Sequence, residues 1–221
     1  RCDIYTDVDG VYTTDPRISP KARKLDKISF EEMLELASLG AKVLQTRSVE
    51  LAMRYKVKLR VLSSFQEPRD DAGTLVCDEE EIMESNVVSG IAYSRDEAKM
   101  TLGSVADRPG TAAAIFGRLS DARINVDMII QNISEDGQTD MTFSCPTDQV
   151  VRAEKALNAA KSGGQIDFKY LLADTNVAKI SAVGIGMRSQ SGVAAKMFKI
   201  LSEEGINIKV IATSEIKISV L

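Results

Sequence analysis

The feature that most constrains the fold of this 221-residue chain is an internal repeat in its C-terminal part. Residues 109–131 and 191–213 match at a constant offset of 82 positions. The identical pairs are Gly110/Gly192, Ala112/Ala194, Ala113/Ala195, Phe116/Phe198, Leu119/Leu201, Ser120/Ser202, Ile124/Ile206, Asn125/Asn207 and Ile129/Ile211. Chance does not give so many matches at one offset, so the pattern predicts two copies of one folding unit.

Each copy has the spacing of a one-sided helix. Apolar residues fall at i, i+3, i+4 and i+7 in both copies. They are Ala112, Ile115, Phe116 and Leu119 in the first copy and Ala194, Met197, Phe198 and Leu201 in the second. Strands are expected before these helices, at about 98–105 and 178–186, and after them, at about 125–133 and 207–213.

The first copy continues with an expected strand near 140–145, a helix near 149–161 and a strand near 166–172, which completes a βαββαβ unit. The second copy reaches a strand at 215–221 and is expected to lack the final helix and strand. That lack would leave an exposed strand edge, which predicts pairing with another chain or poor solubility.

The N-terminal part predicts an α/β domain. An apolar strand at 2–5 leads into a loop rich in turn formers, and Ser29 and Glu32 have the spacing of a capping box for a helix over 29–40. A second helix is expected near 47–55. Alternation at Val57, Leu59 and Val61 then predicts a strand.

The opening strand has no preceding element to pair with, which predicts further N-terminal sequence. The acidic segment 66–85, with Pro68, is the expected domain linker, although 73–76 could dock as a short strand.

Composition excludes several classes of function. The chain has no histidine, which removes Ser-His and Cys-His dyads and imidazole metal ligands. Its three cysteines are far apart, so neither a disulfide framework nor a zinc site is expected. The net charge of −4 and the lack of a basic stripe argue against nucleic-acid binding. No signal peptide or membrane span is recognisable, so a cytoplasmic location without membrane attachment is expected.

The acids of the first loop have two plain interpretations. The run Asp7-Val8-Asp9-Gly10 has the start of a calcium loop, but the third acid before glycine and the distal glutamate are missing. Turn formation explains Asp7, Asp9 and Asp15 more simply, because aspartate bonds to its own backbone.

The residues from Thr6 through Asp15-Pro16-Arg17, followed by Leu39-Gly40-Ala41-Lys42-Val43-Leu44, closely resemble the nucleotide half of the amino-acid kinase family, specifically the aspartate kinases. The resemblance extends through 73–76 and both repeats, which resemble paired ACT domains. It implies an ATP:L-aspartate phosphotransferase that uses magnesium. The family's N-terminal part, with its Lys-Phe-Gly-Gly motif, is absent, so this chain alone is expected to bind nucleotide weakly and not to turn over.

The resemblance also implies nucleotide contacts. By position, ATP would touch Thr6, Asp7, Tyr12, Arg17, Lys42 and Val43, with Tyr12 near the adenine and both cations near the phosphates. Phosphoryl transfer needs mainly positioning and charge neutralisation, which these side chains can supply without histidine. The alternative for Lys42 is a solvated lysine that follows a helix.

The repeats carry features that suit an amino-acid ligand. A helix N-terminus offers free N–H groups to a carboxylate, and a nearby acid can meet the ammonium group. The run Asp107-Arg108-Pro109-Gly110 supplies both, whereas the second copy has no acid before Gly192. The simpler interpretation of Gly110, Gly192, Asn125 and Asn207 is helix and strand punctuation.

The resemblance implies specific effector contacts. Threonine-type effectors would lie by Asp107, Ala112, Gln131, Asn207 and Ile208. Lysine-type effectors would lie by Met187, Gln190, Val193, Ser214 and Glu215. A carboxylate at Glu215 could pair with a lysine ammonium, although an exposed acid at a strand end is an equal alternative.

The sequence thus predicts an α/β plus α+β protein: a partial amino-acid-kinase domain at 1–82, a ferredoxin-like ACT repeat at 83–175 and a truncated second repeat at 176–221. The expected function is phosphorylation of L-aspartate to 4-phospho-L-aspartate, regulated by lysine, threonine or both, in a homo-oligomer joined through the repeats. The alternative is a non-catalytic regulatory subunit that binds amino acids and could begin at Met83.

Overall fold

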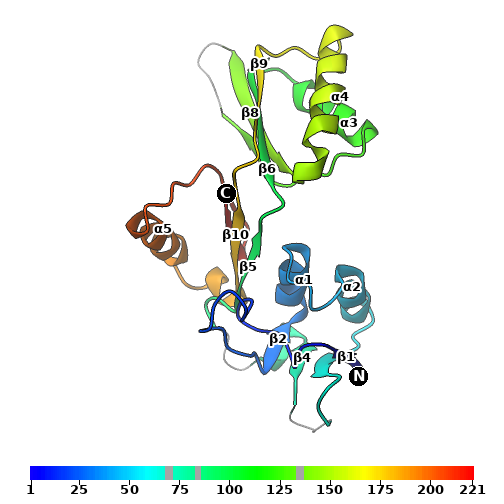
Figure 1. The fold of residues 1–221 in the computed structure, drawn as a ribbon, viewed down its shortest axis with the longest axis vertical. Helices are drawn as coiled ribbons and strands as arrows, with labels where there is room; N and C mark the ends of the chain where they lie inside the picture. Colours follow the sequence, from blue (N-terminus) through cyan, green and yellow to red (C-terminus); the bar gives the residue numbers. More distant parts are fainter. Residues whose placement is uncertain (68–71, 83–85, 133–136) are drawn as a thin grey trace. The chain divides into compact units, whose positions relative to one another are not determined.

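The computed structural model of this chain describes residues 1–67, 72–82, 86–132 and 137–221 (Figure 1). The chain forms two compact units, and each is considered by itself. The first unit contains Arg1–Ser94 and Ile180–Leu221, and the second contains Arg95–Lys179. The second unit is therefore inserted into the sequence of the first.

The N-terminal part of the first unit is built on a mixed sheet of order β1-β3-β4-β2. The strands are β1 (Cys2–Thr6), β2 (Lys27–Ser29), β3 (Leu59–Ser63) and β4 (Thr74–Cys77). β1 runs parallel to β3 and β2 parallel to β4, whereas β3 and β4 are antiparallel. The predicted opening strand is confirmed.

The strand predicted from the alternation after Val57 is confirmed, but both of its faces are buried. β3 begins at Leu59, and all five of its residues are buried because β1 and β4 flank it. Burial includes Arg60, which is only 6% exposed and reaches the Asp3 carboxylate at 3.2 Å. This hydrogen bond from Arg60 holds the pKa of Asp3 below its ordinary value, against the effect of burial.

Within the predicted linker at 66–85, the alternative that 73–76 docks as a short strand is confirmed. β4 lies inside the mixed sheet, followed by the 3-10 helix η1 (Glu79–Glu81). Thr74 is fully buried, and its Oγ1 accepts from Val11 N at 2.8 Å and donates to Leu25 O at 2.5 Å. Pro68 and Met83, which belong to the linker and alternative-start predictions, lie outside the described residues.

Two helices pack on the core of this part. They are α1 (Phe30–Ser38) and α2 (Thr46–Arg54), close to the predicted ranges. The predicted capping box is present: Glu32 N donates to Ser29 Oγ, and Ser29 N donates to the Glu32 carboxylate, both at 3.1 Å. The buried face of α1 carries Phe30, Met33 and Leu36, which join the apolar core.

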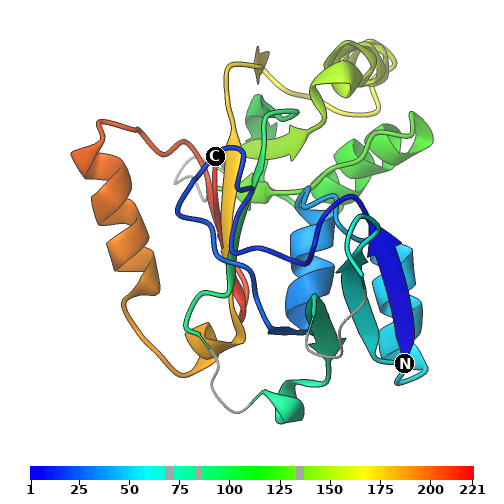
Figure 2. The ribbon, with the colours of Figure 1, turned by 60° about the horizontal axis from the view of Figure 1, so that its bottom comes forward.

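The first unit contains a second sheet, of order β11-β12-β10-β5. Its strands are β5 (Gly90–Ser94), β10 (Lys179–Val183), β11 (Ile211–Thr213) and β12 (Lys217–Val220). The helices α5 (Val193–Glu203) and α1 lie on opposite faces of this sheet (Figures 1 and 2). The predicted open edge is wrong, because β5 lies along β10.

The second unit is the first repeat. Its sheet has the order β7-β8-β6-β9, with strands β6 (Ala98–Ala106), β7 (Ile129–Gln131), β8 (Gln138–Cys145) and β9 (Tyr170–Asp174). The helices α3 (Thr111–Asp121) and α4 (Val150–Ser162) cover one face (Figure 1). η2 (Thr147–Gln149) precedes α4. This arrangement confirms the predicted βαββαβ order.

Several predicted strand limits are too wide. β7 and β11 begin at Ile129 and Ile211, four residues after the predicted asparagines. β9 begins at Tyr170, although Ile166 and Phe168 before it are buried in the core. In these segments the apolar residues indicate burial in the core, but they do not indicate where hydrogen-bonded pairing with a neighbouring strand begins. β10 ends at Val183, and η3 (Ile185–Arg188) takes up the rest of its predicted range.

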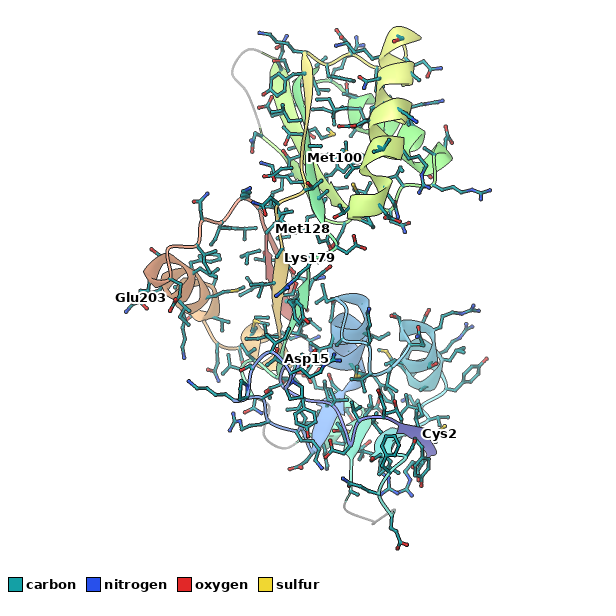
Figure 3. The ribbon with its side chains drawn as sticks, in the orientation of Figure 1. Cys2, Asp15, Met100, Met128, Lys179 and Glu203 are labelled. Carbon is teal, nitrogen blue, oxygen red and sulfur yellow. The ribbon has the colours of Figure 1, made fainter. Side chains whose placement is uncertain are left out.

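A charged cluster joins the two sequence ends of the inserted unit. Lys179 is buried at the start of β10, and its Nζ lies 2.5 Å from Glu97 and 2.7 Å from Asp127 (Figure 3). Burial alone would lower the pKa of Lys179, but the hydrogen bonds to both carboxylates outweigh it and raise the pKa.

Among the described residues, no helix is long and apolar enough to cross a membrane.

The Thr74 hydroxyl gives a test of this fold. Thr74→Val removes a buried group that serves both Val11 N and Leu25 O, so we expect the free energy of unfolding to fall by about 2 kcal/mol. Urea unfolding of the full chain measures the change. Thr74→Ser keeps the hydroxyl and is the matched control; equal losses for both variants would contradict this role.

Candidate nucleotide and effector sites

The loop after β1 folds back on itself before β2, and hydrogen bonds hold its two sides together. Thr13 N donates to Arg23 O and Leu25 N donates to Val11 O, both at 2.8 Å. Tyr12 and Lys24 form an antiparallel bridge between the two sides. The Thr74 hydroxyl of β4 holds both sides of this loop through its hydrogen bonds with Val11 N and Leu25 O. The loop that carries the predicted ATP contacts is thus fastened to the mixed sheet, with Asp15 near its far end (Figure 3).

Tyr12 and Lys24 both bind Asp9 within this loop. Tyr12 Oη donates to Asp9 at 2.9 Å, and Lys24 Nζ lies 3.3 Å from the same carboxylate. Burial favours a raised pKa for Asp9, but the hydrogen bonds from Tyr12 and Lys24 outweigh it and lower the pKa. The hydrogen bond to Asp9 also raises the pKa of Tyr12. Asp9 therefore orients the Tyr12 ring, for which the family resemblance predicts a position near adenine.

The remaining loop residues lie at its two ends. Thr6 closes β1, and its Oγ1 donates to Asp7 at 3.1 Å. Arg17 makes a bidentate contact with Asp15 at 3.0 and 2.8 Å, while its side chain is 88% exposed. The hydrogen bonds from Arg17 lower the pKa of Asp15. An exposed ion pair is weak, so Arg17 can exchange this partner for a phosphate at small cost.

Lys42 and Val43 follow α1. Lys42 is exposed, and Val43 packs partly against the core. No recorded hydrogen bond or ion pair joins either residue to Thr6, Tyr12 or Arg17 within the described part of the chain. Each predicted loop residue therefore has its own local partner, and the ATP contacts of the loop, of Lys42 and of Val43 all stay predictions.

Magnesium would depend on the nucleotide at this loop. Within the residues that the structure describes, no group of three His, Cys, Asp or Glu side chains could hold a metal ion.

The loop is bonded directly to the second repeat's sheet. Ile91 N in β5 donates to Thr13 O at 2.7 Å. One turn into α1, Glu35 pairs with Lys217 of β12 at 3.0 Å. Gly90 packs against Leu36, where an added Cβ would come within 3.0 Å of both methyl groups. These contacts connect the loop after β1 and the helix α1 with the sheet of the second repeat, and all three lie within the first compact unit.

Glu32 is the most buried of these links. It is 1% exposed, and its Oε1 accepts from Ser89 Oγ at 2.6 Å and from Ile185 N at 2.9 Å. Its Oε2 accepts from the N and Oγ atoms of Ser29 at 3.1 Å. One carboxylate therefore caps α1 and also binds the start of η3 and the chain before β5.

The threonine-type residues fall in both units. In the second unit, Gln131 Nε2 donates to Asp107 Oδ1 at 3.2 Å, which brings two of the predicted residues together. Ala112 lies in the first turn of α3, whose N-cap Gly110 supplies no side-chain acceptor to that turn. Asn207 and Ile208 belong to the first unit and lie before β11, not within a strand as predicted.

The lysine-type residues all belong to the first unit. Met187 lies in η3, Gln190 follows it, and Val193 begins α5. Ser214 N donates to Lys217 O at 2.8 Å. Glu215 is 85% exposed and lies 3.5 Å from Arg188, whose Nη1 also reaches Glu79 at 2.8 Å. Glu215 thus already has a cationic partner.

The two helix-start glycines have the simpler role. Gly110 and Gly192 have φ of 94° and 96°, and an added Cβ would meet nothing within 4 Å at either. Left-handed backbone alone therefore explains the glycine in both copies.

Sequence reasoning missed three contributors. β5 was not predicted, although the short apolar run Ile91-Ala92-Tyr93 between Gly90 and Ser94 could have indicated it. Arg188 and Thr13 were not singled out, and the sequence carries no signal for partners so distant along the chain.

The hydrogen bonds of Glu32 give a test of the link between α1 and the second repeat. Glu32→Gln places an amide donor against the Ser29 donors or the Ser89 and Ile185 donors, so we expect a loss of about 2 kcal/mol in the free energy of unfolding. Urea unfolding of the full chain measures it. Glu50→Gln on the exposed face of α2 is the control, and matching values for the two variants would remove Glu32 from this role.

Comparisons with known proteins match the N-terminal part and the two repeats to different families. The profile of the amino acid kinase family matches residues 1–63, and ACT domain profiles match residues 100–162 and 180–221. An aspartokinase of Pseudomonas aeruginosa is 55% identical over 222 residues, covering 100% of this chain and 53% of its own length. The chain thus spans about half the length of the curated relatives it matches.

Solved structures show the same similarity. E. coli aspartokinase III in complex with lysine and aspartate is 30% identical, with a TM-score of 0.75, covering 100% of this chain and 47% of that chain. The ligand-free regulatory subunit of aspartate kinase from Thermus thermophilus is 37% identical, with a TM-score of 0.57, covering 61% of this chain and 87% of that chain.

Proposed function

Because the chain belongs to the aspartate kinase family, we propose that it supplies the nucleotide loop and the amino-acid sensor of a feedback-regulated aspartate kinase. In the reaction, a side-chain carboxylate oxygen of L-aspartate attacks the γ-phosphorus of ATP. The bond from that phosphorus to the β–γ bridging oxygen breaks, which gives 4-phospho-L-aspartate and ADP. The product leads toward lysine, threonine and methionine.

The observation that carries this proposal is the hydrogen bond from Ile91 N to Thr13 O. It joins the loop matched to the kinase family with a strand of the regulatory sheet. A chain that only sensed amino acids would have no use for such a loop. The contact supports one protein in which sensing and nucleotide binding are physically connected.

The loop residues have distinct parts in this function. Tyr12, held by Asp9, would contact the adenine, and Thr6 and Asp7 would lie beside the nucleotide at the carboxyl end of β1. Arg17 and Lys42 would neutralise phosphate charge, because phosphoryl transfer relies on positioning and electrostatics. Magnesium, bound through the phosphates, would add charge neutralisation when present.

Regulation would act through the connected regulatory sheet. An effector shifts the equilibrium between two arrangements only by its difference in affinity for them. The residues proposed to contact a lysine-type effector lie in the same unit as the proposed nucleotide loop: Met187, Gln190, Val193, Ser214 and Glu215. η3 carries Met187, and its first residue, Ile185, binds Glu32 of α1, so a change at η3 would reach α1 directly.

The alternative function is a regulatory subunit that binds amino acids and acts through a partner. The similarity to the Thermus thermophilus regulatory subunit favours it for the ACT part. The match of residues 1–63 to the kinase family favours the enzyme. We also propose that the repeats join copies of this chain into a homo-oligomer, since Ile129 and Ile211 on edge strands β7 and β11 are exposed.

The nucleotide assignment predicts that Arg17 and Lys42 contribute to ATP binding and that Arg23 does not. In an enzyme of the relatives' full length, Arg17→Ala or Lys42→Ala should raise the KM for magnesium ATP about tenfold through loss of a phosphate contact. Steady-state kinase assays measure this. Arg23→Ala, in the same loop but outside the predicted contacts, is the control; no difference from it would place Arg17 outside the site.

The effector assignment predicts a selective loss for each ligand. Calorimetric titration of the full chain with threonine and lysine should show that Asp107→Ala weakens threonine about tenfold and leaves lysine unchanged. Glu215→Ala should do the reverse, so each variant controls the other. If neither amino acid, nor methionine, produces heat with the unaltered chain, the sensing proposal fails.

A further inference from the structure

Strand β6 carries a β-bulge just before the predicted threonine-type site. The register with β8 passes from Leu102 opposite Met141 to Val105 opposite Thr139, which is three steps along β6 for two along β8. Ser104, inside the bulge, has a φ of 54°, an unusual value for a residue with a side chain. Bulges are frequent next to functional sites, where they redirect a side chain.

One carboxylate holds this bulge in place. Asp140 of β8 accepts from Ser104 N at 2.9 Å through Oδ1 and from Tyr170 Oη at 3.2 Å through Oδ2. The Tyr170 ring lies over Gly103, where an added Cβ would come within 1.9 Å of it. Burial, followed by the nearby Asp140 charge, raises the pKa of Tyr170. Asp140 and Tyr170 thus fix the bulge from two neighbouring strands.

The bulge determines which face Asp107 occupies. Before it, Met100 and Leu102 face the buried helix side of the sheet; after it, Val105 does. A one-residue shift reverses the face of every later side chain. With the bulge, Asp107 shares the face of Val105, and Gln131, paired with Met141, shares that of Leu102. Without the bulge, the side chain of Asp107 would lie on the opposite face of the sheet from Gln131.

We propose that Asp140 is a positioning residue for the threonine-type site, which fixes the bulge at Gly103 and Ser104 so that Asp107 meets Gln131. The ligand in this inference rests on the proposed sensing function, whereas the geometry does not. The site consequently depends on a carboxylate that need not touch the effector. Asp107 N, bonded to Gly137 O at 2.9 Å, reports on the same placement.

The experiment combines amide hydrogen exchange at Ser104 and Asp107 in the full chain, followed by NMR, with calorimetric titration of L-threonine. In Asp140→Ala we expect exchange at both amides to rise about tenfold and threonine affinity to fall about tenfold. Asp140→Asn should stay within about threefold of the unaltered chain, because its Oδ1 accepts from Ser104 and its Nδ2 donates to Tyr170. Lysine affinity monitors general folding.

Unchanged Asp107 exchange in Asp140→Ala would overturn the proposal, as would an equal loss in Asp140→Asn. If Asp140→Ala fails to fold, Tyr170→Phe decides: it keeps the ring over Gly103 and should raise exchange at Ser104 and Asp107 about threefold, and no change overturns the proposal. If the unaltered chain binds no threonine, the sensing function fails at this site, while the exchange results still decide the role of Asp140.

Discussion

The Glu32 carboxylate joins three segments that are far apart in sequence: the start of α1, the chain before β5 and the start of η3. A carboxyl group at 1% exposure is tolerated only when hydrogen bonds replace its hydration, and four donors do so here. The close approach of these segments also requires small residues, since an added Cβ at Gly184 or Gly186 would collide with the backbone of residues 86–88. The packing of α1 against the second repeat therefore depends on the Glu32 contacts and the Glu35–Lys217 ion pair as well as on the apolar core.

The insertion of the first repeat explains how the second sheet is completed. The sheet orders β7-β8-β6-β9 and β11-β12-β10-β5 correspond strand by strand, so β5 takes the position that β9 holds in the first repeat. β5 precedes the insertion, and β10 follows it. Because β5 also bonds to the loop after β1 through Thr13, the strand that completes the sheet of the second repeat is the strand that contacts the part similar to the amino acid kinase family.

Local signals in the sequence were sufficient for most helices and for the first repeat. The Ser29–Glu32 spacing and the i, i+3, i+4, i+7 stripes depend on residues within one or two turns, so α1, α3 and α5 could be predicted. β4 could be foreseen only as an alternative to a linker, because acidic residues surround it, and β5 was missed. The second bonds of Glu32 could not be foreseen, since Ile185 lies 153 positions away. Among the site residues, the contact of Asp107 with Gln131 depends on the bulge in β6, and no motif in the sequence announces a register shift.

The two repeats differ at the same structural position. Both helices begin after a glycine in the left-handed region, so both first turns offer N–H groups to an anion. In the first repeat, the preceding Asp107 is held by Gln131 and can meet an ammonium group. In the second, Arg188 stands in that region and binds both Glu79 and Glu215. A ligand with a second ammonium would compete with Arg188 for Glu215, and this exchange would release a contact to η1. The first repeat would recognise its ligand through an acid that the bulge places, and the second through displacement of an ion pair.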